Sequence, residues 1–179
     1  MAQPQPKPDG GQQPPTEKLD PTVSYQLTFR TNCGDFTVDL DTSLAPDTAG
    51  SVIALAKSDF YDGTFFHRIA PGFVIQGGDP TGSGSGGPGY STEDPPPPNT
   101  RYTKGVVAMA KAGPEPRGAA GSQFFVVTGE EVQLEPDYAV LGTIGGGSDV
   151  VERIGALGDP ATEQPTALVV IEDVTVKEA

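Results

Sequence analysis

Residues 65–79 read Phe65-Phe66-His67-Arg68-Ile69-Ala70-Pro71-Gly72-Phe73-Val74-Ile75-Gln76-Gly77-Gly78-Asp79, and this stretch decides the fold of the chain. Apolar residues lie on both sides of Pro71-Gly72, which predicts two strands joined by a tight turn. On such an antiparallel pair, Arg68 and Gln76 would take nearly opposite positions, where Cβ atoms on one face are within about 5.5 Å of each other. A cation and an amide would then share a surface with Phe73 and Val74. That combination favours an exposed groove over a buried core.

The rest of the chain alternates mainly with the period of a β-strand. Apolar residues at every second position predict a hairpin from residues 23–31 and 35–40, and its polar second face indicates an antiparallel sheet. Pro46 suits the first position of a helix, and an apolar stripe follows it. Ser148 is the expected N-cap of a second short helix. Further strands are expected at residues 105–110, 123–128, 138–143 and 167–176, and residues 77–104 are expected to form a loop.

These patterns predict a mainly β protein with at least seven strands and two short helices. Two short helices cannot cover both faces of so many strands. Closing the sheet into an antiparallel barrel removes its exposed edges, and one helix can then cover each open end. Residues 123–128 are largely apolar on both faces, with Gln123 and Phe125 on one side and Phe124 on the other, so this strand is expected to be central.

The N-terminal segment has a different composition. Residues 1–21 combine prolines with glutamine, glycine and lysine and have no apolar periodicity. Such a composition is typical of a disordered or semi-extended tail or linker. We therefore expect a Pro-rich tail at residues 1–21 and one folded domain at residues 22–179, which fits a chain of 179 residues.

Composition argues against several classes of function. The net charge of −13 disfavours a nucleic-acid surface, which needs basic groups to neutralise phosphates. A single cysteine, Cys33, excludes an internal disulfide and a cysteine-rich metal site, and we expect no metal and no cofactor. No apolar run approaches the ~18 residues of a membrane span, and no signal peptide is visible. We expect no membrane insertion and a cytoplasmic location, with an extracytoplasmic domain of an envelope-anchored precursor as the alternative.

Other kinds of catalytic or binding site fit the sequence poorly. The glycines of residues 82–89 satisfy G-x-G-x-x-G, but prolines in and after this segment forbid the helix that a dinucleotide site requires. A serine hydrolase or a zinc site would depend on His67, the only histidine. His67 alternates with Arg68 and so faces the opposite side of its strand, and we expect it to be structural. A glycosidase-like pair of carboxylates stays open, although nothing in the sequence favours it.

Three segments resemble the cyclophilins. Phe66–Ile69 together with Pro71–Asp79 resembles the first signature of that family, and Gly121-Ser122-Gln123-Phe124-Phe125-Val126 resembles the second. Residues 105–110 precede the second signature at a suitable spacing. The resemblance extends over residues 23–176. It implies an eight-stranded antiparallel closed barrel capped by two short α-helices, and it implies peptidyl-prolyl cis-trans isomerase activity that assists protein folding.

The chemistry of such an isomerase fits these residues. An X-Pro bond resists rotation because the nitrogen lone pair is delocalised into the carbonyl, with a barrier of about 18–20 kcal/mol. An apolar cup for the proline ring, and a donor aimed at the pyramidalised nitrogen, would favour the twisted state over either planar one. By resemblance Arg68 is this donor and Gln76 orients its guanidinium. The same resemblance places Phe73, Val74, Phe125 and Leu134 in the cup, Gln123 and the backbone of Ala110 and Lys111 along the flanking peptide, and Tyr138 at the edge of the pocket.

The chain departs from the family pattern at the pocket. Many members have a tryptophan just before the position of Leu134, where this chain has Gln133 and no tryptophan anywhere. That residue commonly helps to bind cyclosporin, so we expect weak cyclosporin binding. Tyr138 replaces the usual histidine, Val74 a usual methionine and Lys111 a usual asparagine. Tyrosine occurs at that place in several microbial relatives, so we expect activity to survive, and we expect Lys111 to favour substrates with acidic flanking residues.

Proline-containing peptide segments of unfolded or folded client proteins are the expected partners, and the chain is expected to act as a monomer. The alternative function is a binding module that grips proline segments with little turnover. The presence of both Arg68 and Phe125 favours the isomerase, since a pure binder does not need the donor. The Pro-rich tail could also serve as a ligand for its own domain, but prolines in tails usually just keep a linker extended.

Overall fold

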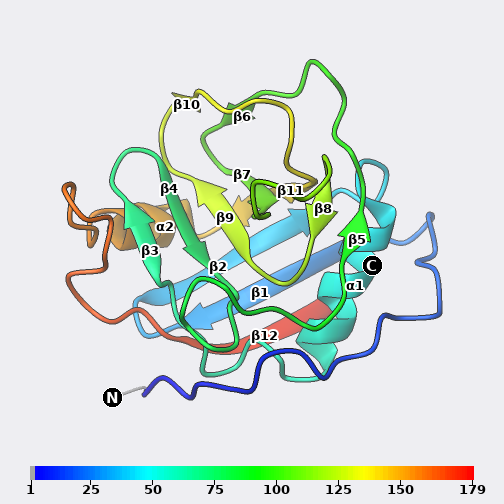
Figure 1. Ribbon diagram of the computed structural model, residues 1–179, viewed down its shortest axis with the longest axis horizontal. Helices are drawn as coiled ribbons and strands as arrows, with labels where there is room; N and C mark the ends of the chain where they lie inside the picture. The colour runs from blue at the N-terminus through cyan, green and yellow to red at the C-terminus, as the bar shows by residue number, and fades with distance from the viewer. Residues whose placement is uncertain (1–2) are drawn as a thin grey trace.

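One strongly curled antiparallel sheet dominates the structure, with a helix on either side of it (Figure 1). The computed structural model of this protein describes residues 3–179. Its helices are α1 (Pro46–Lys57) and α2 (Ser148–Gly155). Its strands are β1 (Tyr25–Thr31), β2 (Gly34–Leu40), β3 (Arg68–Ala70), β4 (Val74–Gly77), β5 (Thr92–Glu93), β6 (Tyr102–Thr103), β7 (Val106–Met109), β8 (Ala119–Ala120), β9 (Phe124–Val127), β10 (Glu131–Val132), β11 (Val140–Gly146) and β12 (Ile171–Glu178).

The main sheet has eight strands in the order β12-β1-β2-β11-β7-β9-β4-β3, and neighbouring strands are antiparallel. Its edge strands meet through the segments that lead into them. Phe65 forms a β-bridge with Val170, and the Phe66 N–H donates to the Val169 carbonyl at 3.0 Å. The predicted mainly β fold of eight antiparallel strands and two helices is confirmed. The closure is looser than predicted, because bridging segments rather than a continuous ladder join the two edges.

The hairpin of residues 68–77 has the predicted register. Arg68 lies opposite Gln76, and Ala70 lies opposite Val74. The turn between them is closed by the Phe73 N–H, which donates to the Ala70 carbonyl at 3.0 Å. Gly72 has a φ of 69°, which the third position of a type II turn requires. The Pro-Gly pair therefore sets the register that brings the cation and the amide together.

Strand β9 separates two apolar clusters. Phe124 and Val126 face the interior, where they pack with residues of β1, β2 and both helices. Phe125 and Val127 face outward and pack with Tyr102 and its neighbours in a smaller cluster. The prediction that this strand is central is confirmed, because β9 is buried along its whole length between β7 and β4.

The two helices cover opposite sides of the sheet (Figure 1). Helix α1 contacts β12 and β5, and it begins at Pro46 as predicted. Helix α2 contacts β2, β3 and β4. The predicted cap of α2 was wrong: the N-cap is Gly147, with a φ of 75° and no side-chain hydrogen bond, and Ser148 is the first helical residue. A Cβ at Gly147 would lie 2.3 Å from the Asp35 carbonyl oxygen, so the close approach to β2 requires glycine there.

One predicted loop contains short strands. The segment predicted as a loop at residues 77–104 contains β5 and β6, which pair with β8 and β10 respectively. Each of these strands has two residues, which is too short for periodicity to reveal.

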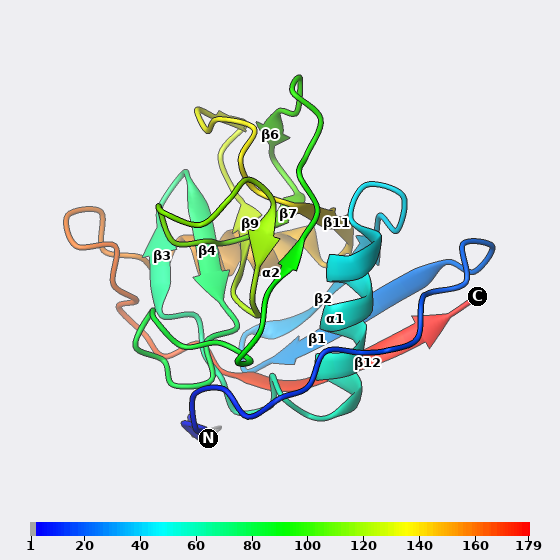
Figure 2. The ribbon, with the colours of Figure 1, turned by 45° about the vertical axis from the view of Figure 1, so that its right-hand side comes forward.

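Residues 3–24 contain no helix or strand and run along the surface past α1 (Figures 1 and 2). Residues 1 and 2 of the predicted tail lie outside the described residues.

The position of Gly147 gives a stability prediction. Gly147→Ala places a methyl group against the backbone of β2 and strains a positive φ, so we expect it to lower the free energy of unfolding by more than about 1 kcal/mol. Gly113→Ala is the matched control, because a Cβ there meets no atom within 4 Å; it should change stability by less than about 0.5 kcal/mol. Urea titration of the two variants measures both values, and equal stabilities would contradict this account.

Candidate active site

A small cavity lies over the outward face of β9 and β4. Its volume is about 160 Å³. Every predicted site residue except Gln123 lines it: Arg68, Phe73, Val74, Gln76, Ala110, Lys111, Phe125, Leu134 and Tyr138. Gln123 lines a neighbouring cavity of about 560 Å³, together with Gln76, Ala110 and Lys111. The structure therefore brings the predicted residues to one surface, divided between two adjoining cavities.

Strand pairing places the central side chains in a row. Arg68 lies opposite Gln76 across β3 and β4, and Gln76 lies opposite Phe125 across β4 and β9. Residues directly opposite one another in antiparallel strands point to the same face. Phe125 is 5% exposed and forms the apolar floor beside the two polar groups. The row thus combines a cation, an amide and an aromatic ring.

The Arg68 guanidinium is fixed from two sides. Its Nε donates to Glu163 Oε2 at 2.7 Å, and its Nη1 donates to Gln76 Oε1 at 3.4 Å. The guanidinium carbon lies 5.8 Å from the centre of the Phe73 ring, within the range of a cation–π contact. Sequence reasoning found Gln76 and missed Glu163. That residue lies 95 positions beyond Arg68 in a loop without periodicity, so no local signal could have found it.

Gln76 is in turn connected to a glycine-rich loop. Its Nε2 donates to Gln123 Oε1 at 3.0 Å. The Gln123 Nε2 donates to the carbonyls of Gly84 and Gly86 at 3.0 and 2.9 Å. On the inner side of this loop the Asp79 carboxylate accepts the Gly84 and Gly86 N–H groups at 2.6 and 3.1 Å. Burial raises the pKa of Asp79, but hydrogen bonds from the Thr81 hydroxyl and from the backbone N–H groups of Gly86, Thr81 and Gly84 outweigh it and hold this pKa below its usual value. The segment that resembled a dinucleotide motif therefore orients a glutamine.

Tyr138 is held over the floor of the small cavity. Its ring meets that of Phe125 edge-on, with centroids 5.5 Å apart and an interplanar angle of 86°. The Tyr102 hydroxyl donates to the Tyr138 carbonyl at 2.8 Å and accepts the Tyr138 N–H at 3.0 Å. Two hydrogen bonds to one residue fix its backbone, so the ring has a defined place at the rim. Tyr102 was not predicted, and only its position in the folded chain identifies it.

Comparison with known proteins bears on this geometry. The sequence model of the family described as cyclophilin type peptidyl-prolyl cis-trans isomerase/CLD matches residues 26–176. This chain belongs to that family. Peptidyl-prolyl cis-trans isomerase A of Mycobacterium tuberculosis (strain ATCC 25618 / H37Rv) is 37% identical over 174 residues, which cover 87% of this chain and 94% of that protein. Peptidyl-prolyl cis-trans isomerase B of Streptomyces anulatus is 38% identical over 169 residues, which cover 84% and 95%.

Solved structures agree with the sequence comparison. A cyclophilin-type isomerase of Cryptosporidium parvum superposes with a TM-score of 0.78 at 30% identity and covers 86% of this chain and 98% of its own. The same protein, solved in the presence of the dipeptide Ala-Pro, gives 0.78 at 31% identity, with 85% and 98% covered. The activity predicted from the sequence, isomerisation of peptidyl-prolyl bonds, is confirmed by these relationships.

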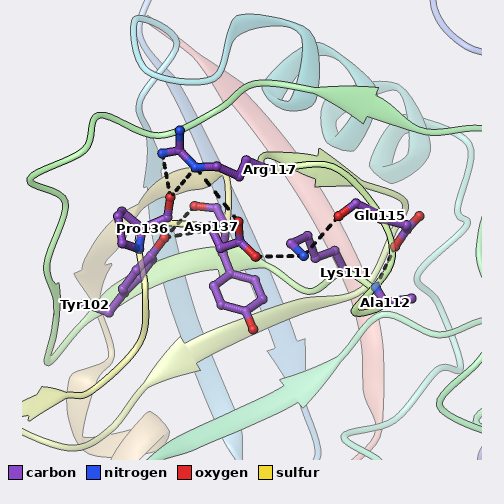
Figure 3. Close-up of polar contacts among 8 residues, drawn as sticks. Tyr102, Lys111, Ala112, Glu115, Arg117, Pro136 and Asp137 are labelled. Atoms are coloured by element: carbon purple, nitrogen blue, oxygen red, sulfur yellow. Dashed lines mark hydrogen bonds and ion pairs between the residues drawn. The ribbon is translucent and has the colours of Figure 1, made fainter.

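The charged rim of this cyclophilin corrects one expectation. The Lys111 side chain is 4% exposed, and its Nζ lies 2.8 Å from Asp137 Oδ2 (Figure 3). The same Nζ lies 5.8 Å from the centre of the Tyr138 ring. Arg117 donates to the Pro136 carbonyl at 2.7 Å and brings a second cation to within 3.9 Å of Asp137. Because the ammonium is buried and already paired, Lys111 is not placed to attract acidic residues of a substrate. Its charge ties two loops of the rim together instead.

The backbone of Ala110 is less available than predicted. Its N–H donates to the Gln123 carbonyl at 3.0 Å, so this group cannot bind a peptide. The contact does hold Gln123 against the start of the loop at residues 110–118. Ala110 also lines both cavities, and a peptide contact through the rest of its backbone stays a prediction.

His67 lies beside the site and outside its chemistry. It lines neither of the two cavities, and its Nδ1 is buried without a hydrogen-bond partner in the described chain. Burial lowers the pKa of His67 below 6.5, an effect that Arg68 strengthens and Asp79 opposes. Within residues 3–179 no group of three or more histidine, cysteine or acidic side chains could hold a metal ion, and no helix is long and apolar enough to cross a membrane.

The lowered pKa of His67 predicts how stability depends on pH. The unfolded chain binds a proton at this histidine near pH 6.5, whereas the folded chain does so only at lower pH. The free energy of unfolding should therefore fall as the pH drops below about 6.5, between the two pKa values. His67→Gln removes this contribution, so denaturant titrations at pH 7.5 and 5.5 should show a smaller loss of stability for the variant. An equal loss in both proteins would contradict the account.

Proposed function

We propose that Arg68 catalyses rotation about an X-Pro bond by donating a hydrogen bond to the imide nitrogen. The observation that carries this proposal is the place of its guanidinium, at the wall of the small cavity and held by Glu163 and Gln76. Nη2 has no hydrogen-bond partner within residues 3–179, so it is free to donate to a bound peptide.

The donor acts on the transition state because the acceptor exists only there. In a planar imide the nitrogen lone pair is delocalised into the carbonyl, and the nitrogen accepts hydrogen bonds poorly. Twisting the bond localises the lone pair and creates an acceptor. A guanidinium already held in place then stabilises the twisted state more than either planar state, which is differential binding of the transition state. Each 1.36 kcal/mol gained in this way raises the rate about tenfold.

The small cavity is the proposed cup for the proline ring. Its volume of about 160 Å³ lies below the roughly 300–1,000 Å³ of pockets that hold drug-sized ligands, so it suits a single ring. Phe125 and Val74 are 5% and 2% exposed, and they offer the ring an apolar floor. The Cryptosporidium relative solved in the presence of Ala-Pro supports proline peptides as the ligand class. Residues flanking the proline would lie in the larger cavity beside Gln123.

Two substitutions test the role of Arg68. Arg68→Ala removes one preorganised donor, and we expect kcat/KM to fall by about 10²–10³-fold, the usual cost of such a loss. Glu163→Gln keeps the guanidinium but weakens the group that orients it, so we expect a smaller loss, about tenfold or less. A protease-coupled assay with a chromogenic proline peptide measures both variants.

Arg30→Ala is the matched control for these variants. Arg30 is also an arginine on a strand in contact with acidic residues, 3.9 Å from Glu172 and 3.8 Å from Asp173, but it lies on β1. It should keep the activity of the parent. Full activity of Arg68→Ala would show that the assignment of the donor is wrong.

Weak inhibition by cyclosporin is a separate expectation. Gln133 is exposed and does not line the small cavity, so the chain offers no indole beside Leu134. Cyclosporin should inhibit the parent weakly in the coupled assay. It should inhibit the Gln133→Trp variant at lower concentrations, because this substitution restores an aromatic surface. Inhibition of the parent by nanomolar cyclosporin would contradict this proposal. The monomeric state and the cytoplasmic location stay predictions.

A further inference from the structure

The N-terminal segment is hydrogen-bonded to the glycine-rich loop at residues 84–89. The Gly10 N–H donates to the Gly87 carbonyl and the Gln12 N–H donates to the Pro88 carbonyl, each at 2.9 Å. In the other direction, the Gly87 N–H donates to Asp9 Oδ1 at 2.9 Å. In Figures 1 and 2 the segment follows the lower edge of the molecule beside this loop. Residues that composition described as a linker therefore lie against the wall of the larger cavity.

The order of prolines in the segment suits this arrangement. Pro4, Pro6 and Pro8 have no N–H, and the residues between them, Gln5 and Lys7, donate to the carbonyls of Gly63 and Pro80 at 2.8 and 2.7 Å. Prolines are tolerated where the N–H would otherwise face solvent, as on an edge strand. They also reduce the freedom of the undocked chain, so docking costs less conformational entropy. The alternation of prolines with hydrogen-bonding residues thus favours a segment that binds the folded domain along one of its sides.

Side-chain and backbone contacts anchor the segment at both ends of this stretch. The Lys7 ammonium donates to the Phe60 carbonyl at 3.0 Å and also to the Asp59 carbonyl, just beyond the end of α1. Gly89 has a φ of 97°, and a Cβ there would lie 3.0 Å from the Gly10 Cα and 3.1 Å from the Gly11 nitrogen. The backbones of the segment and the loop therefore pack directly against each other.

One peptide group connects the segment to the substrate groove. The Gly86 carbonyl and the Gly87 N–H belong to the same planar trans peptide and point in opposite directions. The carbonyl accepts the Gln123 Nε2 at 2.9 Å, while the N–H donates to Asp9 at 2.9 Å. Glycine on both sides gives this peptide unusual freedom to rotate. The Asp9 carboxylate accepts the Gly87 N–H on the outer side of the loop, so it opposes that rotation and keeps the Gly86 carbonyl pointing toward Gln123.

We propose that Asp9 is a positioning residue for this isomerase: it fixes the Gly86–Gly87 peptide and thereby orients the Gln123 amide that receives the substrate. Asp9 touches neither cavity, so it acts only through this peptide. The effect reaches further, because Gln123 accepts from Gln76 at 3.0 Å and Gln76 accepts from Arg68 at 3.4 Å. The inference rests on the proposed role of Gln123 in holding the flanking peptide.

The test uses two substitutions at one position of the full chain. Asp9→Ala removes the acceptor, and we expect the KM for a proline peptide with several flanking residues to rise about threefold to tenfold with kcat little changed, the range for one hydrogen bond. Asp9→Asn keeps the acceptor oxygen and should behave like the parent. Glu17→Ala is the matched control, since Glu17 is an exposed carboxylate of the same segment without a hydrogen bond or ion pair within residues 3–179; it should also behave like the parent.

Nuclear magnetic resonance separates this mechanism from a general loss of stability and from a failure of the assigned function. In Asp9→Ala the side-chain amide signals of Gln123 should shift and the Gly87 amide should exchange faster, whereas Asp9→Asn should retain both parent signals. These readouts need no turnover, so they stand even if the role of Gln123 in substrate binding is wrong. The proposal is overturned if Asp9→Ala leaves the Gln123 signals and the KM unchanged, or if Asp9→Asn loses as much as Asp9→Ala.

Discussion

Strand β9 must be buried on both of its faces, and the rest of the structure depends on this constraint. Phe124 and Val126 complete the interior of the curled sheet, while Phe125 and Val127 form the floor under the site. A shift of one residue in the pairing with β4 would exchange these two sets and remove Phe125 from the cavity. The core and the proposed active site thus lie on the two faces of one four-residue strand, so the register that determines the fold also determines the site.

Arg68, the proposed catalytic donor, lies beside an apolar floor and needs partners that hold its guanidinium in place while it stays charged and able to donate. Arg68 is 36% exposed in its side chain, so it retains part of its hydration, and Glu163 supplies the opposite charge. The ion pair uses Nε, the Gln76 contact uses Nη1, and Arg68 also lines the small cavity. A lysine could not satisfy these three directions at once, because its ammonium is a point charge without a fixed plane.

Much of the fold and the site could be predicted from particular local patterns. Pro71-Gly72 between apolar runs gave the register of Arg68 and Gln76, and the double-sided apolar character of residues 124–127 gave the central strand. Other expectations failed where the deciding contact is remote. Ser148 has the right chemistry for a cap, but the approach of Gly147 to the Asp35 carbonyl left the cap position to glycine. Lys111 was expected to favour substrates with acidic flanking residues, but its ammonium is paired with Asp137, and that pairing depends on how two loops meet.

The sequence by itself determined the longer strands and the faces of those strands, because these follow from short-range periodicity. It also pointed to the residues proposed for the cup, through signature motifs that are contiguous in the chain. Only the tertiary structure decided which acid holds Arg68, where the charge of Lys111 goes, and that the Pro-rich segment lies against residues 84–89. Each of those contacts involves at least one loop without a periodic signal, and the partners lie up to 95 positions apart in the chain. The folded chain decides which residues meet in these contacts, because folding brings distant segments together and leaves a few backbone groups that still need a hydrogen-bond partner.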